Sequence, residues 1–187
     1  WMVEDGLVER ETAEALKVER RLHGGKTHPL VVIADQKWRS NKPPVRLLNL
    51  ENLTEWLAAK TGLDYLHIDP LKIDFTGVAD VMSSAYAGRF GILPVQVTTR
   101  EVVIATAEPF VREWVEELKP ILRKEIRRVM ANPEDISRYL VEFFSLAKSV
   151  KKAAAQGELS AGLSSFEQLV ELGKTTRQYD ANDQHIV

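Results

Sequence analysis

Two Gly-Lys-Thr triplets, at residues 25–27 and 173–175, come closer to a chemical motif than anything else in this sequence. In a phosphate-binding loop, such a triplet follows a strand, opens a helix and stands after an earlier glycine, so that backbone amides and the lysine surround nucleotide phosphates. Arg20 and Gln168 occupy the positions of that earlier glycine. We therefore interpret both triplets as helix ends followed by polar turns, and we expect this chain alone not to hydrolyse ATP.

The remaining polar residues form no recognisable metal site or catalytic set. The sequence has no cysteine, and of its four histidines only His23 and His28 come near the spacing of metal ligands. Their position beside two glycines is better explained by a loop. Neighbouring carboxylates such as Glu116 and Glu117 fall on a helix surface, where solvation accounts for them. We expect no catalytic, cofactor-binding or metal-binding residue in this chain.

Six residues are instead candidates for partner binding. Four of them form a local basic cluster: Arg123, Lys124, Arg127 and Arg128. Such a cluster suits an acidic partner, although a run of cations is more often a solvated face. The other two are Trp38 and Trp56, which are hard to place inside the fold, so that either is a candidate interface anchor.

The composition is that of a soluble globular protein. Of the 187 residues, 44% are hydrophobic and 28% are charged, which allows one domain or two small ones. The longest apolar run, Leu30–Ala34, is far shorter than the roughly 20 residues of a membrane helix, so we expect no direct membrane span. A net charge of −2 with interspersed signs argues against nucleic-acid binding. The lack of cysteine suits a reducing cytoplasm, and the ends at Trp1 and Val187 suggest a piece of a longer chain.

A β-hairpin at residues 89–110 is the element around which the chain is organised. Residues 92–98 carry Val95 and Val97 on one face and Gln96 and Thr98 on the other, whereas residues 102–107 are apolar almost throughout, as in a strand covered on both faces. The second strand is therefore predicted at the centre of a small sheet. Pro94 has no N–H for a ladder and is predicted near the start or at an edge of the first strand.

Residues 1–60 are predicted to form a helical N-terminal segment. Its helices are expected at residues 9–22, 29–37 and 50–59. The second of them is open to another interpretation, because the apolar run Leu30–Ala34 also suits a buried strand. The third has Asn49 as its cap and Gly62 as its end.

Residues 61–152 are predicted to form an α/β core domain. Besides the hairpin, its elements are a short strand at residues 65–68, a helical turn or short helix at residues 80–87, and helices at residues 111–119 and 133–150. The helix at residues 111–119 should stop before Pro120, because proline disfavours a helical conformation in the preceding residue. Residues 121–130 keep helical spacing but also suit a strand at 125–130, and the local pattern does not decide.

Residues 153–187 are predicted to be a linker and the start of the next domain. The linker, residues 153–163, is rich in alanine, glycine and serine and has few large apolar side chains to anchor it. A capping box from Ser164 to Glu167 then opens a short helix that runs to Leu172.

Five short stretches of the chain carry a family resemblance through their order and spacing. They are Leu53–Leu63, Ile68–Asp74, Tyr86–Pro94, Ala105–Pro109 and Ala131–Ile136. Together they resemble the N-terminal region of the type II secretion and type IV pilus assembly ATPases, the GspE/PulE/PilB family. The resemblance implies an α/β (α+β) fold with a small antiparallel sheet packed with helices, and it favours a strand at residues 124–130.

The resemblance also implies a function. The family's ATP-binding loop and its magnesium-coordinating acidic motifs lie further along than this chain, so ATP and magnesium are expected in the parent chain, which is expected to be a hexamer. This part then resembles a docking and regulatory domain that binds the cytoplasmic part of an inner-membrane platform protein. Such a chain would be cytoplasmic and peripheral to the bacterial inner membrane through that partner.

Cyclic di-GMP binding is the alternative that the resemblance raises. Some relatives bind this nucleotide through tandem repeats with an Arg-Leu-Gly start, a Gly-Leu-Ile centre and a closing Gln. Gly6-Leu7-Val8 resembles one such centre. Arg20 stands near the place of the closing Gln, and Thr27-His28-Pro29 replaces the second start. An independent enzyme is the third and least supported class.

Overall fold

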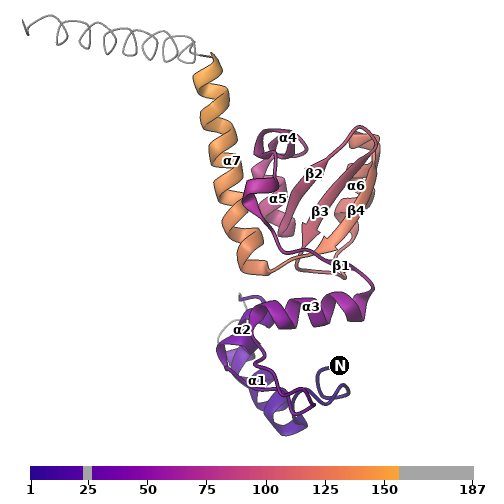
Figure 1. Ribbon diagram of the computed structural model, residues 1–187, viewed down its shortest axis with the longest axis vertical. Helices are drawn as coiled ribbons and strands as arrows, with labels where there is room; N and C mark the ends of the chain where they lie inside the picture. Colours follow the sequence, from indigo (N-terminus) through magenta and orange to yellow (C-terminus); the bar gives the residue numbers. More distant parts are fainter. Residues whose placement is uncertain (23–26, 156–187) are drawn as a thin grey trace, which may run out of the picture. The chain divides into compact units, whose positions relative to one another are not determined.

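The computed structural model describes residues 1–22 and 27–155 (Figure 1). The helices in these ranges are α1 (Arg10–Leu22), α2 (Pro29–Asp35), α3 (Leu50–Thr61), the short 3₁₀ helix η1 (Pro70–Lys72), α4 (Phe75–Ala79), α5 (Ser84–Phe90), α6 (Glu113–Leu122) and α7 (Pro133–Ala155). The strands are β1 (Asp64–Tyr65), β2 (Ile92–Val97), β3 (Glu101–Thr106) and β4 (Glu125–Met130). The fold is mixed α and β, as predicted.

The chain divides into two compact units, residues 1–144 and 145–187, so that the boundary falls inside α7. The structure describes the second unit only as far as Ala155. The predicted helix at residues 164–172 and most of the predicted linker lie outside the described residues. The predicted domain boundaries stay predictions.

The predicted hairpin is confirmed as the antiparallel pair β2 and β3, with Val97 opposite Val102 and Ile92 opposite Thr106. The sheet order is β1-β4-β3-β2, which places β3 inside the sheet and β2 at an edge. Pro94 lies in this edge strand, where its missing N–H costs little, and the register shifts between Pro94 and Gln96.

The sheet as a whole is mixed, whereas a small antiparallel sheet was expected. β4 runs parallel to β3, with Val102 opposite Ile126, and parallel to β1, with Asp64 opposite Val129. The connection from β3 to β4 passes through α6, and a helical crossover returns the chain in the same direction. The strand that the family resemblance favoured at residues 124–130 is confirmed as β4.

Two apolar clusters cover the two faces of the sheet. One packs α4 and the first half of α7 on the sheet, with these buried residues: Ile68, Val78, Leu93, Val95, Val103, Ala105, Ala107, Val129, Ala131, Ile136, Tyr139 and Phe143. The other packs α5 and α6 on the opposite face: Met82, Ala87, Ile92, Val102, Ile104, Trp114 and Leu118. The alternation of β3 side chains between the two clusters follows from the two-residue repeat of a strand.

α6 runs past the expected stop and includes Pro120. Trp114 and Leu118 are buried against the sheet and hold the helix in place. The carbonyl that Pro120 leaves without its usual helical partner belongs to Glu116, which is exposed and open to water. The helix ends instead at Arg123, whose φ of 51° lies in the left-handed region.

The predicted helices of the N-terminal segment are confirmed. α2 forms instead of a buried strand, because Pro29 occupies its first position and the His28 ring accepts a hydrogen bond from the Leu30 N–H at 3.2 Å. α3 begins at the cap Asn49 and ends at Gly62, whose φ is 68°. A third apolar cluster holds this segment together through Val8, Leu30, Leu48 and Leu53.

Candidate functional site

An apolar groove of about 170 Å³ runs between α1 and α2 and contains Trp38. Its lining is apolar apart from one lysine: Ala13, Leu16, Lys17, Pro29, Val32, Ile33 and Trp38. Trp38 is half-buried and packs on the N-terminal apolar cluster. Its side chain thus forms part of the groove wall, where an apolar side chain of a partner could contact it.

Trp56 lines a second hollow, of about 430 Å³, on the N-terminal segment. Residues from the chain start and from α1 complete it: Trp1, Met2, Val3, Glu4, Arg10, Ala13, Glu14 and Lys17. The indole N–H of Trp56 donates to Asp5 Oδ2 at 2.8 Å, and Lys60 pairs with Asp5 Oδ1 at 2.6 Å. Hydrogen bonds from Lys60 and then Trp56 lower the pKa of Asp5. Ala13 and Lys17 line both cavities, so α1 lies between them.

The four residues of the predicted basic cluster lie in different surroundings in the structure. Arg123 is exposed at the end of α6. Lys124 Nζ donates to the Thr98 carbonyl at 2.7 Å. Arg127 on β4 pairs with Glu101 at 3.0 Å and with Asp64 at 3.6 Å, so its charge is largely balanced within the chain.

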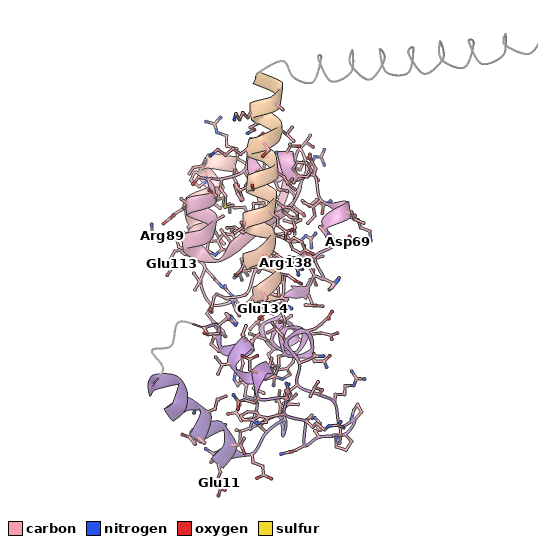
Figure 2. All side chains as sticks on the ribbon, turned by 90° about the vertical axis from the view of Figure 1, so that its left-hand side faces the viewer. Glu11, Asp69, Arg89, Glu113, Glu134 and Arg138 are labelled. Carbon is pink, nitrogen blue, oxygen red and sulfur yellow. The ribbon has the colours of Figure 1, made fainter. Side chains whose placement is uncertain are left out.

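Arg128 points to the other face of the sheet from Arg127, as the strand repeat requires. It is half-buried and donates to the Pro109 carbonyl at 3.0 Å. Burial lowers the pKa of Arg128, and the nearby positive charge of Arg112 adds to this. Arg138, a basic residue close by in sequence, lies on α7 (Figure 2). It pairs with Asp135 at 2.7 Å. These cations therefore form no single surface, and their part in partner binding stays a prediction.

An open groove of about 390 Å³ lies on the sheet itself. Its floor consists of Val95, Val103 and Val129, one from each of the three longer strands. Arg127, Lys72 and Asp69 lie at its rim, and Lys72 forms an ion pair with Asp69. Asp69 projects from the core in Figure 2. Because each of these cations already has a carboxylate partner, the groove has no net charge that would select a charged ligand.

Two sets of polar contacts connect the N-terminal segment with the sheet, and sequence reasoning missed both. His28 Nε2 lies 3.3 Å from the carbonyl oxygen of Ala107 and 3.3 Å from Glu108 Oε1. The Tyr65 hydroxyl donates to Glu51 Oε1 at 3.1 Å, and burial followed by this hydrogen bond raises the pKa of Tyr65. Each contact joins residues far apart in sequence, so local pattern carries no signal for it.

The structure brings together no metal site among residues 1–22 and 27–155, since no group of three or more histidines, aspartates and glutamates there could hold an ion. Most of the first Gly-Lys-Thr triplet and all of the second lie outside the described residues. Within the described part of the chain, no helix is both long and apolar enough to cross a membrane.

Comparisons with known proteins agree with the fold and the sequence resemblance. The MshEN domain family model matches residues 61–150. The type IV pilus assembly ATPase TfpB of Acinetobacter baylyi is 36% identical over 191 aligned residues, which include all of this chain. The chain spans about a third (32%) of the length of that relative.

Two solved structures match parts of this chain, and the first of them has a similar fold. A structure of MshE with cyclic di-GMP has a TM-score of 0.54 at 16% identity and covers 76% of this chain and 94% of its own. A structure of the XpsE N-terminal domain has a TM-score of 0.43 at 13% identity and covers 76% of this chain and 90% of its own. Residues 61–150 thus match the MshEN domain model, and these similarities together fit a GspE/PilB-like N-terminal region of the secretion and pilus assembly ATPases.

Proposed function

We propose that this chain is the N-terminal docking and regulatory domain of a pilus or secretion assembly ATPase, and that it binds the cytoplasmic part of an inner-membrane platform protein. The observation that carries docking is the pair of cavities beside α1, each with a tryptophan in its wall. In this proposal ATP and magnesium act in later domains of a hexameric parent chain. The chain itself is cytoplasmic and reaches the inner membrane only through its partner.

The chemistry of the two cavities supports this role. Tryptophan is enriched among the few residues that contribute most of the binding energy at protein interfaces. The groove at Trp38 is almost wholly apolar, and the N-terminal segment around it carries many charged side chains. A standard interface buries on the order of 800 Å² per partner, an area that three helices can present.

The test is a calorimetric titration of the chain with the purified cytoplasmic domain of the platform protein from the same organism. We expect saturable binding that Trp38→Ala and Trp56→Ala each weaken about tenfold or more. Ile121→Ala is the matched control, because Ile121 is 72% exposed on α6 and lies outside both cavities. Wild-type binding with unchanged affinity in both tryptophan variants would show that docking uses another surface, the first candidate being the Arg123–Arg128 cluster.

Cyclic di-GMP sensing is the second candidate function. Two observations favour it: the fold is shared with MshE, whose structure was solved with this nucleotide, and Gly6 has a φ of 70° at the start of the Gly6–Val8 stretch. A titration of the chain with cyclic di-GMP separates the two functions. Saturable heat at low micromolar cyclic di-GMP would support the sensing function. If no such heat is seen and the chain binds the platform domain, the result supports the docking function alone.

A further inference from the structure

Residues 36–50 carry four cations and no acidic residue. The cations are Lys37, Arg39, Lys42 and Arg46, and all four are exposed. The flanking acidic residues are Asp35 and Glu51, at the two ends of the stretch. In a chain with a net charge of −2 and otherwise interspersed signs, this is a local excess of positive charge.

The backbone of this stretch is ordered as a small hairpin, called the basic hairpin (residues 37–47) below. Arg39 and Leu47 form an antiparallel bridge, and the Ser40 N–H donates to the Arg46 carbonyl at 2.8 Å. The Ser40 hydroxyl donates to the Lys42 carbonyl at 2.9 Å. The adjoining Leu48 is buried in the N-terminal apolar cluster. The cations are therefore displayed on a backbone that is already fixed, which lowers the entropy lost on binding.

No ion pair balances the charge of the basic hairpin within residues 1–22 and 27–155. Among the described residues, none of its four cations takes part in an ion pair, in contrast to Arg127 with Glu101 and Lys60 with Asp5. Lys42 has only a weak charge effect on Asp5, which Lys60 already neutralises. Two apolar side chains lie between the cations, Val45 at 58% and Leu47 at 44% exposure.

We propose that the basic hairpin binds an acidic segment of the platform protein, with Arg39 and Arg46 meeting carboxylates and Val45 and Leu47 contacting the aliphatic parts between them. The proposal rests on the docking function proposed above and names the charge of the partner. Arginine suits carboxylates because its planar guanidinium can donate two parallel hydrogen bonds. Trp38 belongs both to the basic hairpin and to the wall of the apolar groove, so the two features form one continuous surface.

A protein partner fits this surface better than a membrane. Stable membrane binding combines cations with a substantial buried apolar area or a lipid anchor. Here the hairpin offers only Val45 and Leu47 as exposed, non-proline apolar side chains. An acidic protein segment needs no insertion and can match both the spacing of the cations and the shape between them.

The experiment measures the affinity of the chain for the purified cytoplasmic domain of the platform protein at about 0.05 and 0.5 M salt, on either side of physiological screening. We expect the double variant R39E/R46E to bind at least about tenfold more weakly at low salt and to lose most of the salt dependence. The affinity of R39Q/R46Q should lie between those of R39E/R46E and the wild-type chain. The control R100E/K119E reverses two exposed cations outside the hairpin and should stay within about twofold.

The outcomes separate the inference from the function on which it rests. If the wild-type chain does not bind the platform domain, both the docking function and the proposed role of the basic hairpin are wrong. If the wild-type chain binds and R39E/R46E binds with the same affinity, docking stands but the proposed role of the basic hairpin is wrong. A third arm mixes the chain with vesicles of anionic phospholipid: if R39E/R46E abolishes vesicle binding but leaves platform binding unchanged, the cations serve a lipid surface and the proposal is wrong. Circular dichroism melts of each variant confirm that the fold is retained.

Discussion

The indole N–H of Trp56 donates a 2.8 Å hydrogen bond to Asp5, a residue 51 positions earlier in the chain. This bond ties the chain start to α3, so Trp56 has a structural role beside its predicted role in docking. Trp56→Phe keeps an aromatic ring in the hollow and removes the N–H. We expect a lower urea midpoint with platform affinity within about twofold, because the ring provides the apolar contact.

Trp56→Ala removes both the bond and the ring, and it should lose affinity as well as stability. If Trp56→Phe weakens platform binding as much as Trp56→Ala does, then the hydrogen bond to Asp5, rather than the ring, shapes the docking surface.

Asp74 caps α4 and should make stability depend on pH. Hydrogen bonds from the Thr76 hydroxyl at 2.6 Å and then from the Gly77 N–H lower the pKa of Asp74. Because the folded pKa lies below the unfolded value of about 4, the stabilisation is fully present above that pH and is lost as the pH falls through the folded pKa. Asp74→Ala should cost about 1 kcal/mol at neutral pH, as for other caps. The difference from wild type in urea melts should shrink below about pH 4.

Asp74→Asn supplies the control for this prediction, since an asparagine can cap without a charge. It should unfold near the wild-type midpoint at neutral pH and show a weaker pH dependence. A difference between Asp74→Ala and wild type that stays constant down to pH 2, well below the unfolded pKa of about 4, would contradict the assignment to this carboxylate.

Gly77 leaves room for this cap. A Cβ at Gly77 would lie 2.6 Å from Asp74 Oδ2, so Gly77→Ala should displace the carboxylate and lower the thermal midpoint. In the Asp74→Ala background the obstacle is gone, and the same change should be neutral or stabilising because alanine favours helices. A double-mutant cycle measures this coupling. Equal effects of Gly77→Ala in both backgrounds would show that the Asp74 side chain is not what limits this position.

Pro120 lies inside α6, where it removes one helical hydrogen bond. Its side chain is exposed, so replacing it loses little packing. Pro120→Ala should raise the free energy of unfolding by about 2 kcal/mol, since the helical gain of about 3 exceeds the entropy that alanine returns to the unfolded chain. Urea denaturation measures the change. A lower midpoint would indicate that the proline stiffens the turn at Arg123.

Elements with strong local signals could be predicted from sequence. Asn49 and Gly62 mark the two ends of α3, and Asn132 accepts a hydrogen bond from the Glu134 N–H at the start of α7. The alternation from Val95 to Thr98 and the apolar run in β3 indicated a hairpin whose second strand lies at the centre of the sheet. These signals act within a few residues, which is why they can be read without tertiary information.

Features that depend on distant partners could not be predicted in the same way. The apolar residues of this stretch keep helical spacing: Leu122, Ile126, Val129 and Met130. It is the pairing of Val129 with Ala105 and of Met130 with Thr106 that makes it a strand. The same holds for the candidate site, because Asp5 is far from Trp56 in sequence. The opposite directions of Arg127 and Arg128 would have followed from the two-residue repeat once a strand had been chosen there.

Hydrogen–deuterium exchange of the chain with and without the cytoplasmic domain of the platform protein tests the central claim most directly. We predict slower exchange on binding in α1 and in the basic hairpin, the elements around Trp38 and Trp56, and unchanged exchange in the β2–β3 turn and α6. Protection confined to residues 122–128 and the sheet groove, with none in residues 1–60, would contradict docking through the N-terminal segment.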